Sequence, residues 1–294
     1  MTATTTAEPT GLVHGMPDAE YHQMPGLSAT GMKWMLRSPA HYRQMIDHRV
    51  EKAVFDFGHA VHAKILGVGM DVAVIPDEVL AANGAASTKA AKDFIADARA
   101  NGLVPVKADT MAEVDAIAEA VLAHPKASPL LALPGDPEVS LFGHDPETNV
   151  RLRGRIDYLA RTPYDQVVNV DVKTTNDVRR LKVSRTIADF GYDIQSEAYK
   201  HLLRINGLDP APTHLIFVEK DPPHEVRVVQ LAHPDWIDVG RTLMRRAIDL
   251  YAACTATDTW PGDDDAPGEA DVINPPGFYL HQHELELDDD IEVI

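Results

Sequence analysis

The sequence predicts an α/β domain in which one central, mixed β-sheet is flanked by helices, with a helical region before the sheet. Three observations support this fold class. Helix-like and strand-like segments are interspersed along the 294 residues, three short apolar strands follow one another directly, and no internal repeat is present. A chain of this length can bury a large core.

The N-terminal half is expected to be mainly helical after a flexible lead formed by residues 1–20. Ser28 is a suitable N-cap for the first helical segment, and Ser38-Pro39 interrupts that segment. The expected segments in chain order are a helical stretch at 27–45, a second helix at 55–66 and an Ala-rich helical insertion at about 76–127, with breaks near 83–84 and 101–105.

The C-terminal half changes to short apolar or alternating runs separated by turn residues. The first three runs should form neighbouring antiparallel strands. The expected segments are strands at 138–142, 150–160 and 166–173, a helix at 183–205, strands at 213–219 and 225–231, and a long helix at 235–254.

The composition excludes several classes of protein. The single cysteine, Cys254, rules out a disulfide framework and a cysteine-bound zinc or iron–sulfur cluster. The sequence contains neither a P-loop motif nor a Gly-rich dinucleotide-binding loop. No apolar run reaches the roughly 18 residues of a membrane span, and the first residues lack the features of a signal peptide. We therefore expect a cytoplasmic protein with no membrane partner.

The net charge of −18 is unevenly distributed along the chain. Residues 262–294 hold eleven acidic side chains and no Lys or Arg, so residues 1–261 carry 27 basic against 34 acidic side chains. A body of modest negative charge leaves room for a basic groove, especially where divalent metal offsets carboxylates. We expect residues 21–261 to form the functional domain and residues 262–294 to form an acidic, Pro/Gly-rich tail.

Charged residues interrupt two of the predicted strands. Asp157 lies in one strand, and Asp171 and Lys173 lie two residues apart on the next, so the latter two point to the same face. Buried charges are costly unless they pair or bind metal. A divalent cation removes the repulsion between two carboxylates, and a lysine beside them can help to activate water. The three residues therefore predict phosphodiester hydrolysis assisted by Mg²⁺.

These residues resemble the signature of the PD-(D/E)XK nuclease superfamily, which pairs one acidic residue with a downstream (D/E)-x-K. Here the spacer between Asp157 and Asp171 is thirteen residues long. On the following helix, Gln195 and Tyr199 resemble the Q-x-x-x-Y pair of the RecB-like branch. Upstream, residues 58–62 (GHAVH) resemble the G-x-x-x-H helix that carries a histidine ligand in that branch. Residues 21–42 and 217–226 are similar to segments of exonuclease VIII (RecE)-type phage and prophage exonucleases, so the resemblance spans about residues 21–261.

The resemblance implies a PD-(D/E)XK nuclease fold and a role for each matching residue. The implied metal ligands are His62, Glu138, Asp157, Asp171 and the carbonyl of Val172, and the implied catalytic group is Asp157, Asp171, Lys173, Gln195 and Tyr199. Lys173 would activate the attacking water, and His59 competes with His62 as the ligand. Glu138 is a ligand, a carboxylate that supports the ligands, or, since it follows Gly135-Asp136-Pro137, a solvated carboxylate in a loop. Lys33, Arg37 and Arg43 either bind a 5′-phosphate at the DNA end or form an ordinary basic helix face.

The activity implied by the resemblance is a Mg²⁺-dependent 5′→3′ double-strand DNA exonuclease, with Mn²⁺ as a substitute metal. Such an enzyme leaves 3′ single-stranded overhangs for single-strand-annealing recombination, is phage-encoded, and works in the cytoplasm of a bacterial host cell. It forms a homo-oligomeric ring, a tetramer or trimer, and has an annealing recombinase as its partner. The alternatives are an end-independent or single-strand nuclease of the same fold, a catalytically inactive DNA-binding module, and an interaction protein whose acidic tail is the functional part.

Overall fold

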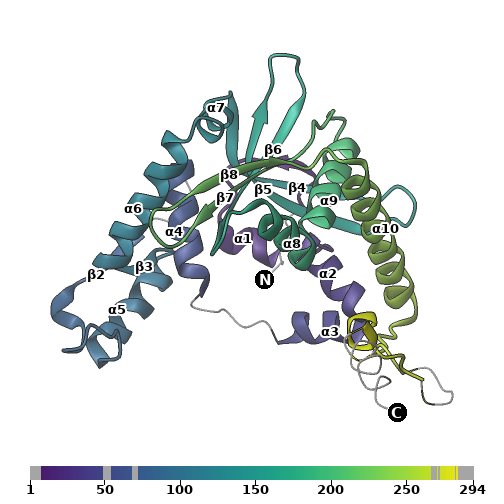
Figure 1. Cartoon of the computed structure of the whole chain (residues 1–294), viewed down its shortest axis with the longest axis horizontal. Coiled ribbons are helices and arrows are strands. Elements are labelled where there is room, and N and C mark those ends of the chain that lie inside the picture. The colour runs from purple at the N-terminus through teal and green to yellow at the C-terminus, as the bar shows by residue number, and fades with distance from the viewer. Residues whose placement is uncertain are drawn as a thin grey trace, which may run out of the picture. The chain divides into compact units, whose positions relative to one another are not determined.

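The computed structural model describes residues 8–48, 54–67, 72–265, 270, 272–281 and 283. The chain divides into two compact units, Met1–Gly262 and Asp263–Ile294. The helices and strands labelled in Figure 1 belong to the first unit. Within the described part of the chain, none of the helices combines the length and the apolarity that crossing a bilayer requires.

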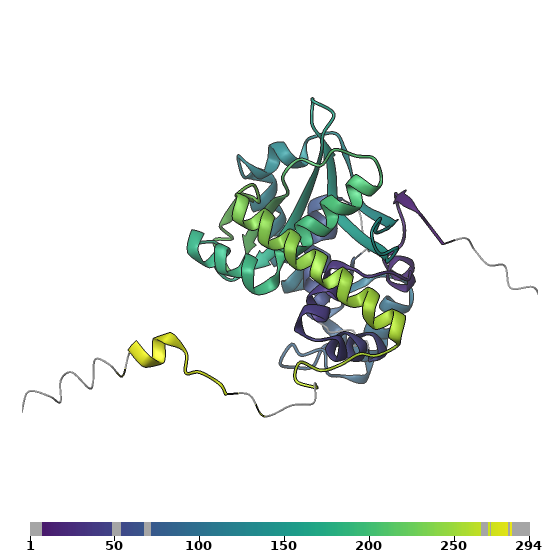
Figure 2. The same cartoon turned by 90° about the vertical axis from the view of Figure 1, so that its right-hand side faces the viewer.

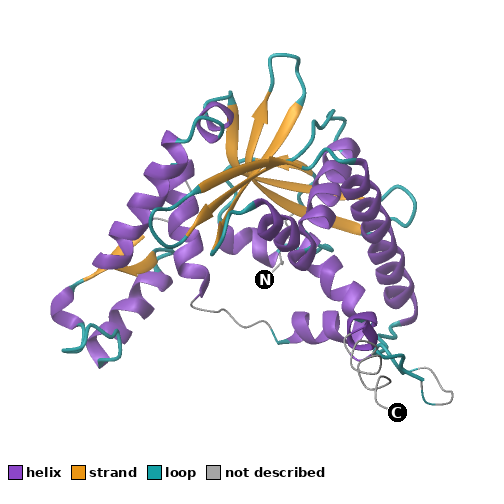
Figure 3. Ribbon diagram, in the orientation of Figure 1, coloured by secondary structure: helices purple, strands orange, loops and turns teal. Residues whose placement is uncertain are grey.

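A mixed sheet forms the centre of the first unit, and the described residues contribute six strands to it in the order β1-β4-β5-β6-β7-β8 (Figures 1 and 3). Neighbouring strands pair antiparallel except β6 and β7, which are parallel and therefore need a helical crossover between them. The strands are β1 (Gly11–Val13), β4 (Gly135–His144), β5 (Arg151–Arg161), β6 (Val167–Thr175), β7 (His214–Glu219) and β8 (Val226–Gln230). The fold class predicted from the sequence is confirmed.

Helices cover both faces of this sheet (Figure 3). They are α1 (Asp18–Gln23), α2 (Ala29–Arg37), α3 (Pro39–Asp47), α4 (Val54–Leu66), α5 (Lys89–Ala100), α6 (Ala108–Ala123), α7 (Ala127–Leu131), α8 (Arg180–Phe190), α9 (Tyr192–Ile205) and α10 (Pro234–Thr257), with a short 3₁₀ turn at Asp77–Val79. A separate two-stranded parallel sheet joins β2 (Val72–Ile75) to β3 (Val104–Lys107).

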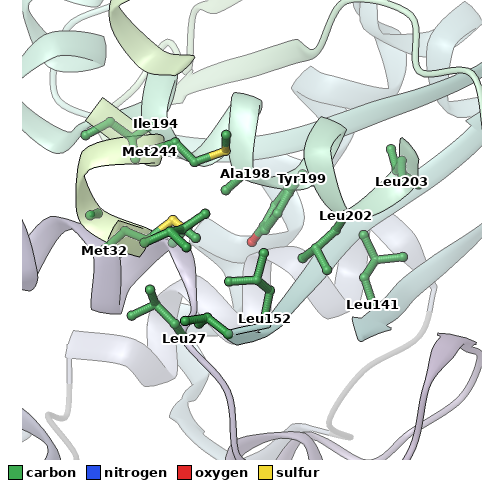
Figure 4. Packing of buried hydrophobic residues seen from close by; sticks show 14 of the residues in the cluster. Leu27, Met32, Leu141, Leu152, Ile194, Ala198, Tyr199, Leu202, Leu203 and Met244 are labelled. Atoms are coloured by element: carbon green, nitrogen blue, oxygen red, sulfur yellow. The ribbon is translucent and has the colours of Figure 1, made fainter. Parts of the chain in front are cut away.

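One face of the sheet is packed against α2, α9 and α10. Tyr199 and Leu202 of α9 lie over Leu141 and Leu152 of the sheet (Figure 4), and Figure 2 shows α10 running across the outside of this layer. A Cβ atom at Gly154 of β5 would lie 2.9 Å from the Tyr199 ring. Glycine is therefore needed there for α9 to approach the sheet closely.

The opposite face is packed against α4 and α6, and β6 divides its side chains between the two faces. Val170 and Val172 join the buried cluster under α4 and α6. Asp171 and Lys173 alternate with them and therefore point to the side that α8 and α9 cover. One strand thus supplies apolar core on one side and charged groups on the other.

Several predicted boundaries differ from the structure. Residues 11–13, expected within a flexible lead, form β1 and pair with β4, and α1 begins at Asp18; residues 1–7 lie outside the described residues. The insertion at 76–127 is not purely helical, because its break near Pro105 is β3. The helix expected at 183–205 is two helices, α8 and α9. Gly191 ends α8 in the left-handed conformation, with φ of 61°, which glycine adopts without steric cost.

The two helices at 27–45 share Ser38 as their boundary. Ser28 caps α2 by accepting a hydrogen bond from the Gly31 N–H, as expected, and Ser38 accepts one from the His41 N–H at the start of α3. The strand expected from residue 138 begins at Gly135, so Glu138 lies inside β4 and not in a loop.

A buried carboxylate ties the β4–β5 turn to the helical layer. Asp145 accepts hydrogen bonds from Arg245 of α10 at 2.8 and 3.1 Å and from the Thr148 N–H, and it lies 2.9 Å from Nε2 of His201 in α9. Burial alone would raise the pKa of Asp145, but the hydrogen bonds from Arg245 and Thr148 outweigh it and hold the pKa well below its ordinary range.

We expect Asp145→Asn to lower the free energy of unfolding by about 2 to 4 kcal/mol, because it leaves the Arg245 guanidinium without its buried counter-charge. The measurement is urea unfolding at pH 7. A carboxylate with a lowered pKa stabilises the fold above its unfolded-state pKa and loses this effect as pH falls, so the difference from wild type should shrink below about pH 4. The matched control is Glu147→Gln, which removes an exposed partner 3.7 Å from the same arginine and should cost under about 1 kcal/mol.

Candidate metal centre and nuclease site

The site lies where β5 and β6 separate. The ladder between these strands runs from Arg161↔Val167 to Tyr158↔Val170. Beyond it, the backbone N–H of Val172 donates to Oδ2 of Asp157 at 2.9 Å. A side-chain carboxylate therefore takes the place that a backbone carbonyl would have in a continued ladder, and it is fixed beside the peptide of Val172.

Asp157 and Glu138 lie at a common irregularity of β4 and β5. The pairs Pro137↔Tyr158 and Val139↔Ile156 flank them, so the two carboxylates are opposite each other in register. Ile156 packs in the cluster under α9, whereas Tyr158, two residues on, packs in the cluster under α4 and α6. Glu138 has a φ of 51°, which is uncommon for a residue with a side chain and is often found at functional sites. The irregularity brings both carboxylates to one point.

His62 of α4 completes a group of three possible ligands. Its Nε2 lies 2.9 Å from the carbonyl oxygen of Val172, and its Nδ1 lies 3.6 Å from Oδ2 of Asp157. Ligand atoms of His62, Glu138 and Asp157 all lie within 4.8 Å of one another. The imidazole therefore reaches the sheet where Asp157 meets the peptide of Val172.

Asp171, which is buried, and Lys173, which is partly exposed, form an ion pair next to this group. Nζ of Lys173 lies 2.6 Å from Oδ2 of Asp171. Gln195 Nε2 donates to the other oxygen of Asp171 at 3.0 Å and lies 3.3 Å from the hydroxyl of Tyr199. Among the described residues, Asp171 is not part of the group of ligand atoms around His62. The structure thus brings all the residues of the sequence signature together, in two adjoining subsets.

The three cations expected at a DNA end are separated. Lys33 lies near the site: its Nζ donates to the Phe190 carbonyl at 2.8 Å and lies 5.9 Å from the ring centroid of Tyr192, the ring that Lys173 also faces. Arg37 lies over the Trp34 ring. Arg43 is 3.1 Å from Asp47 and lies over Trp260.

Burial and mutual charge change the protonation of the site. Burial and, next, the Asp171 carboxylate raise the pKa of Asp157 to about 6, while His62 and Lys173 oppose this rise. For Lys173, burial lowers the pKa, but Asp171 and Asp157 overcome this and raise it above the ordinary lysine value. Burial and the nearby Lys173 ammonium lower the pKa of Lys33 to about 8.

Arg155 is a site residue that sequence reasoning missed. Its Nε lies 2.6 Å from Oε2 of Glu138, and its guanidinium carbon lies 5.4 Å from the ring centroid of Tyr21. Its Nη1 is buried and has no hydrogen-bond partner among the described residues. The signal was present, because Arg155 precedes Asp157 by two residues on the same strand. Tyr192, whose ring centroid is 4.7 Å from Nζ of Lys173, was missed as well.

The residues present fit a divalent cation. Carboxylates and a backbone carbonyl are the oxygen ligands that Mg²⁺ and Mn²⁺ prefer, and a neutral imidazole is a common nitrogen ligand for metal ions. With metal–oxygen distances of 2.0–2.1 Å, adjacent ligands of an octahedral ion lie about 3 Å apart, and His62 Nε2 and the Val172 oxygen are 2.9 Å apart. The repulsion that raises the pKa of Asp157 is the kind that a bound cation relieves.

A solved structure shares this fold. A candidate exonuclease from Eubacterium rectale matches with a TM-score of 0.57 and 10% identity, over 92% of this chain and 98% of that chain. A phage-related exonuclease from Haemophilus somnus 129PT matches with a TM-score of 0.34 and 10% identity, over 80% of this chain and 97% of that chain. The first likeness supports the fold alone, and the second is too slight to carry an argument. No curated protein sequence matches the chain.

The family model described as a PDDEXK-like domain of unknown function (DUF3799) matches residues 28–274, which is most of the chain. The match includes the ligand group around His62 and the whole of the sheet from β4 to β8. The chain therefore belongs to this PDDEXK-like family and, with it, to the PD-(D/E)XK nuclease superfamily.

Proposed function

We propose that the protein is a divalent-metal-dependent nuclease that hydrolyses phosphodiester bonds of DNA. The observation that carries this proposal is the position of an ammonium group, Lys173, beside the carboxylates of Asp157 and Asp171, with His62 and Glu138 within reach of one ion. Burying carboxylates, an imidazole and a lysine together is costly, so a structural role alone does not account for this group. The same groups are those that metal-assisted attack on a phosphate requires.

A bound Mg²⁺, or Mn²⁺ in its place, would stabilise negative charge on the scissile phosphate as a Lewis acid. His62, Glu138, Asp157 and the Val172 carbonyl would hold it. Asp171 would contribute as a further ligand or by holding Lys173, which lies 2.6 Å from its Oδ2.

Lys173 acts on the attacking water through charge and hydrogen bonding. Asp171 and Asp157 raise the pKa of Lys173 and so favour its protonated, ammonium form in the metal-free site. Its three N–H donors orient the water and stabilise the negative charge that develops on the water oxygen. Gln195 holds Asp171, which in turn holds Lys173, and Tyr199 supports Gln195.

We further propose the 5′→3′ double-strand DNA exonuclease activity that the sequence resemblance implies, with Lys33 as the residue for the 5′-phosphate. Its support is the similarity to exonuclease VIII (RecE)-type enzymes together with the position of Lys33 beside the site. The product would carry a 3′ single strand for annealing recombination. The same proposal, supported by the same sequence similarity, includes a ring-shaped trimer or tetramer and an annealing recombinase as partner. It also includes a phage origin and action in the bacterial cytoplasm.

Lys173→Ala should reduce cleavage of linear DNA by at least about 100-fold, because the charge that stabilises the attacking oxygen is lost. The variant should still bind Mn²⁺ in a calorimetric titration. Asp157→Ala should lose both cleavage and Mn²⁺ binding. The control is Lys92→Ala on the exposed side of α5, which should match wild type in both assays. Equal loss of Mn²⁺ binding in the two site variants would contradict the separate roles.

Mn²⁺ affinity should fall in acid, because a carboxylic acid must lose its proton before it can bind metal. Since burial and Asp171 raise the pKa of Asp157 to about 6, the affinity should change little above pH 7 and fall by about tenfold per pH unit below pH 6. Calorimetric titrations at pH 5, 6 and 7.5 measure this. A fall only below about pH 4, as a carboxyl group of ordinary pKa would give, would contradict the raised pKa of Asp157.

DNA ends should be required for cleavage. With Mg²⁺, 5′-phosphorylated linear duplex should be degraded while circular single-stranded DNA and closed circular duplex stay intact. Cleavage of the single-stranded circle would instead identify a single-strand or end-independent nuclease. If the folded protein binds Mn²⁺ but leaves every DNA intact, the proposed activity on DNA is wrong. If it cleaves no DNA and also fails to bind Mn²⁺, the alternative of a DNA-binding module without catalysis is favoured.

A further inference from the structure

An exposed aromatic side chain lies one contact away from the catalytic lysine. The centroid of the Tyr192 ring lies 4.7 Å from the Lys173 ammonium. The ring of Phe190 stacks on the Tyr192 ring, with centroids 5.8 Å apart and planes 17° apart. Phe190 keeps 58% of its surface exposed. The ring is thus presented to solvent at the edge of a charged site.

Phe190 is held in place from both sides. It is the last residue of α8, and Gly191 follows it with a φ of 61°. A Cβ atom at Gly191 would lie 2.8 Å from the Lys33 side chain, so only glycine allows this close turn. Lys33 in turn donates to the carbonyl of Phe190 at 2.8 Å. The ring is therefore presented on a fixed backbone beside a phosphate-binding candidate.

The rest of α8 carries unusual charge for this acidic chain. Residues 179–190 hold four cations and one acid. Arg179 pairs with Asp177, but Arg180, Lys182 and Arg185 are exposed and form no ion pair with any described residue. Arg180 and Lys182 lie in the first turn of α8, where the helix dipole disfavours positive charge. These cations therefore do not stabilise the helix.

We propose that α8 is a binding track for the substrate strand, on which Phe190 stacks against an unpaired base and the cations of α8 contact phosphates. An exposed aromatic ring at the end of a helix that carries several exposed cations matches the chemistry of a single-stranded segment of nucleic acid. A base can stack on a side chain only after it has left its partner, so the nucleotide at Phe190 is unpaired when bound. This inference rests on the proposed nuclease function and adds the conformation of its substrate.

The test measures binding of a fluorescein-labelled single-stranded oligonucleotide by anisotropy, with Mg²⁺ and in a Lys173→Ala background that keeps the strand intact. Phe190→Ala should weaken binding by about 5- to 100-fold, the usual effect of losing one base–aromatic stack. Phe190→Leu should lose nearly as much, and Phe190→Trp should bind like the parent. The matched control is Tyr164→Ala, which removes an aromatic ring that is 88% exposed in the β5–β6 loop. It should leave binding unchanged.

An abasic scan identifies the stacked base. Each oligonucleotide in the scan lacks one base, and the parent protein should bind weakly to the one that lacks the stacked base. Phe190→Ala should bind that abasic strand and the intact strand equally, because the base and the ring stabilise the complex only together. Arg185→Ala should reduce the slope of log affinity against log salt by about one, as expected for one lost phosphate contact.

Cleavage of linear duplex by the wild-type protein is measured in parallel and separates the two proposals. If wild type cleaves DNA but Phe190→Ala binds normally, or Phe190→Leu binds as well as the parent, the stacking role is wrong and the nuclease proposal stands. If the loss of binding from each abasic position simply adds to the loss from Phe190→Ala, Phe190 stacks on none of the bases and the binding track lies elsewhere. A wild-type protein that neither cleaves nor binds any DNA overturns both proposals.

Discussion

The hydrogen bond from the Val172 N–H to the Asp157 carboxylate is the contact on which the site depends. It replaces a backbone pair at the point where β5 and β6 part, and so places a carboxylate inside a sheet without leaving the peptide of Val172 unsatisfied. The Val172 carbonyl then faces His62. One residue, Val172, thus connects its own strand, the neighbouring strand and a helix from the opposite layer. An ion held there would be fixed by all three.

Buried charge is the second constraint. Asp157 and Asp171 repel each other in a site with little water, as the raised pKa of Asp157 reflects, and Lys173 relieves the repulsion only in part. Placing charges where there is little water costs stability, but it strengthens their electrostatic interaction with a bound cation and a phosphate. The overall charge of −18 does not oppose such a substrate. Eleven of the acids lie in residues 262–294, and α8 carries three exposed cations, Arg180, Lys182 and Arg185.

The fold was largely predictable from local patterns. Period-two alternation and turn residues identified the three antiparallel strands around Asp157, and the N-cap at Ser28 marked a helix start. The errors arose where pairing is between distant segments. β1 has three residues and gains its strand geometry from β4, and β3 is a strand because β2 lies beside it. Neither segment carries enough local signal to be distinguished from a loop.

The sequence alone determined that Asp171 and Lys173 share a face, because alternation on a strand is a local property. It also supplied the family signature around them. Only the tertiary structure decided that α4 brings His62 to the backbone of Val172, and that Glu138, with a φ of 51° inside β4, lies opposite Asp157. Those placements follow from how helices pack on the sheet and where strand pairing stops. Such constraints join residues far apart in the chain, and no local pattern encodes them.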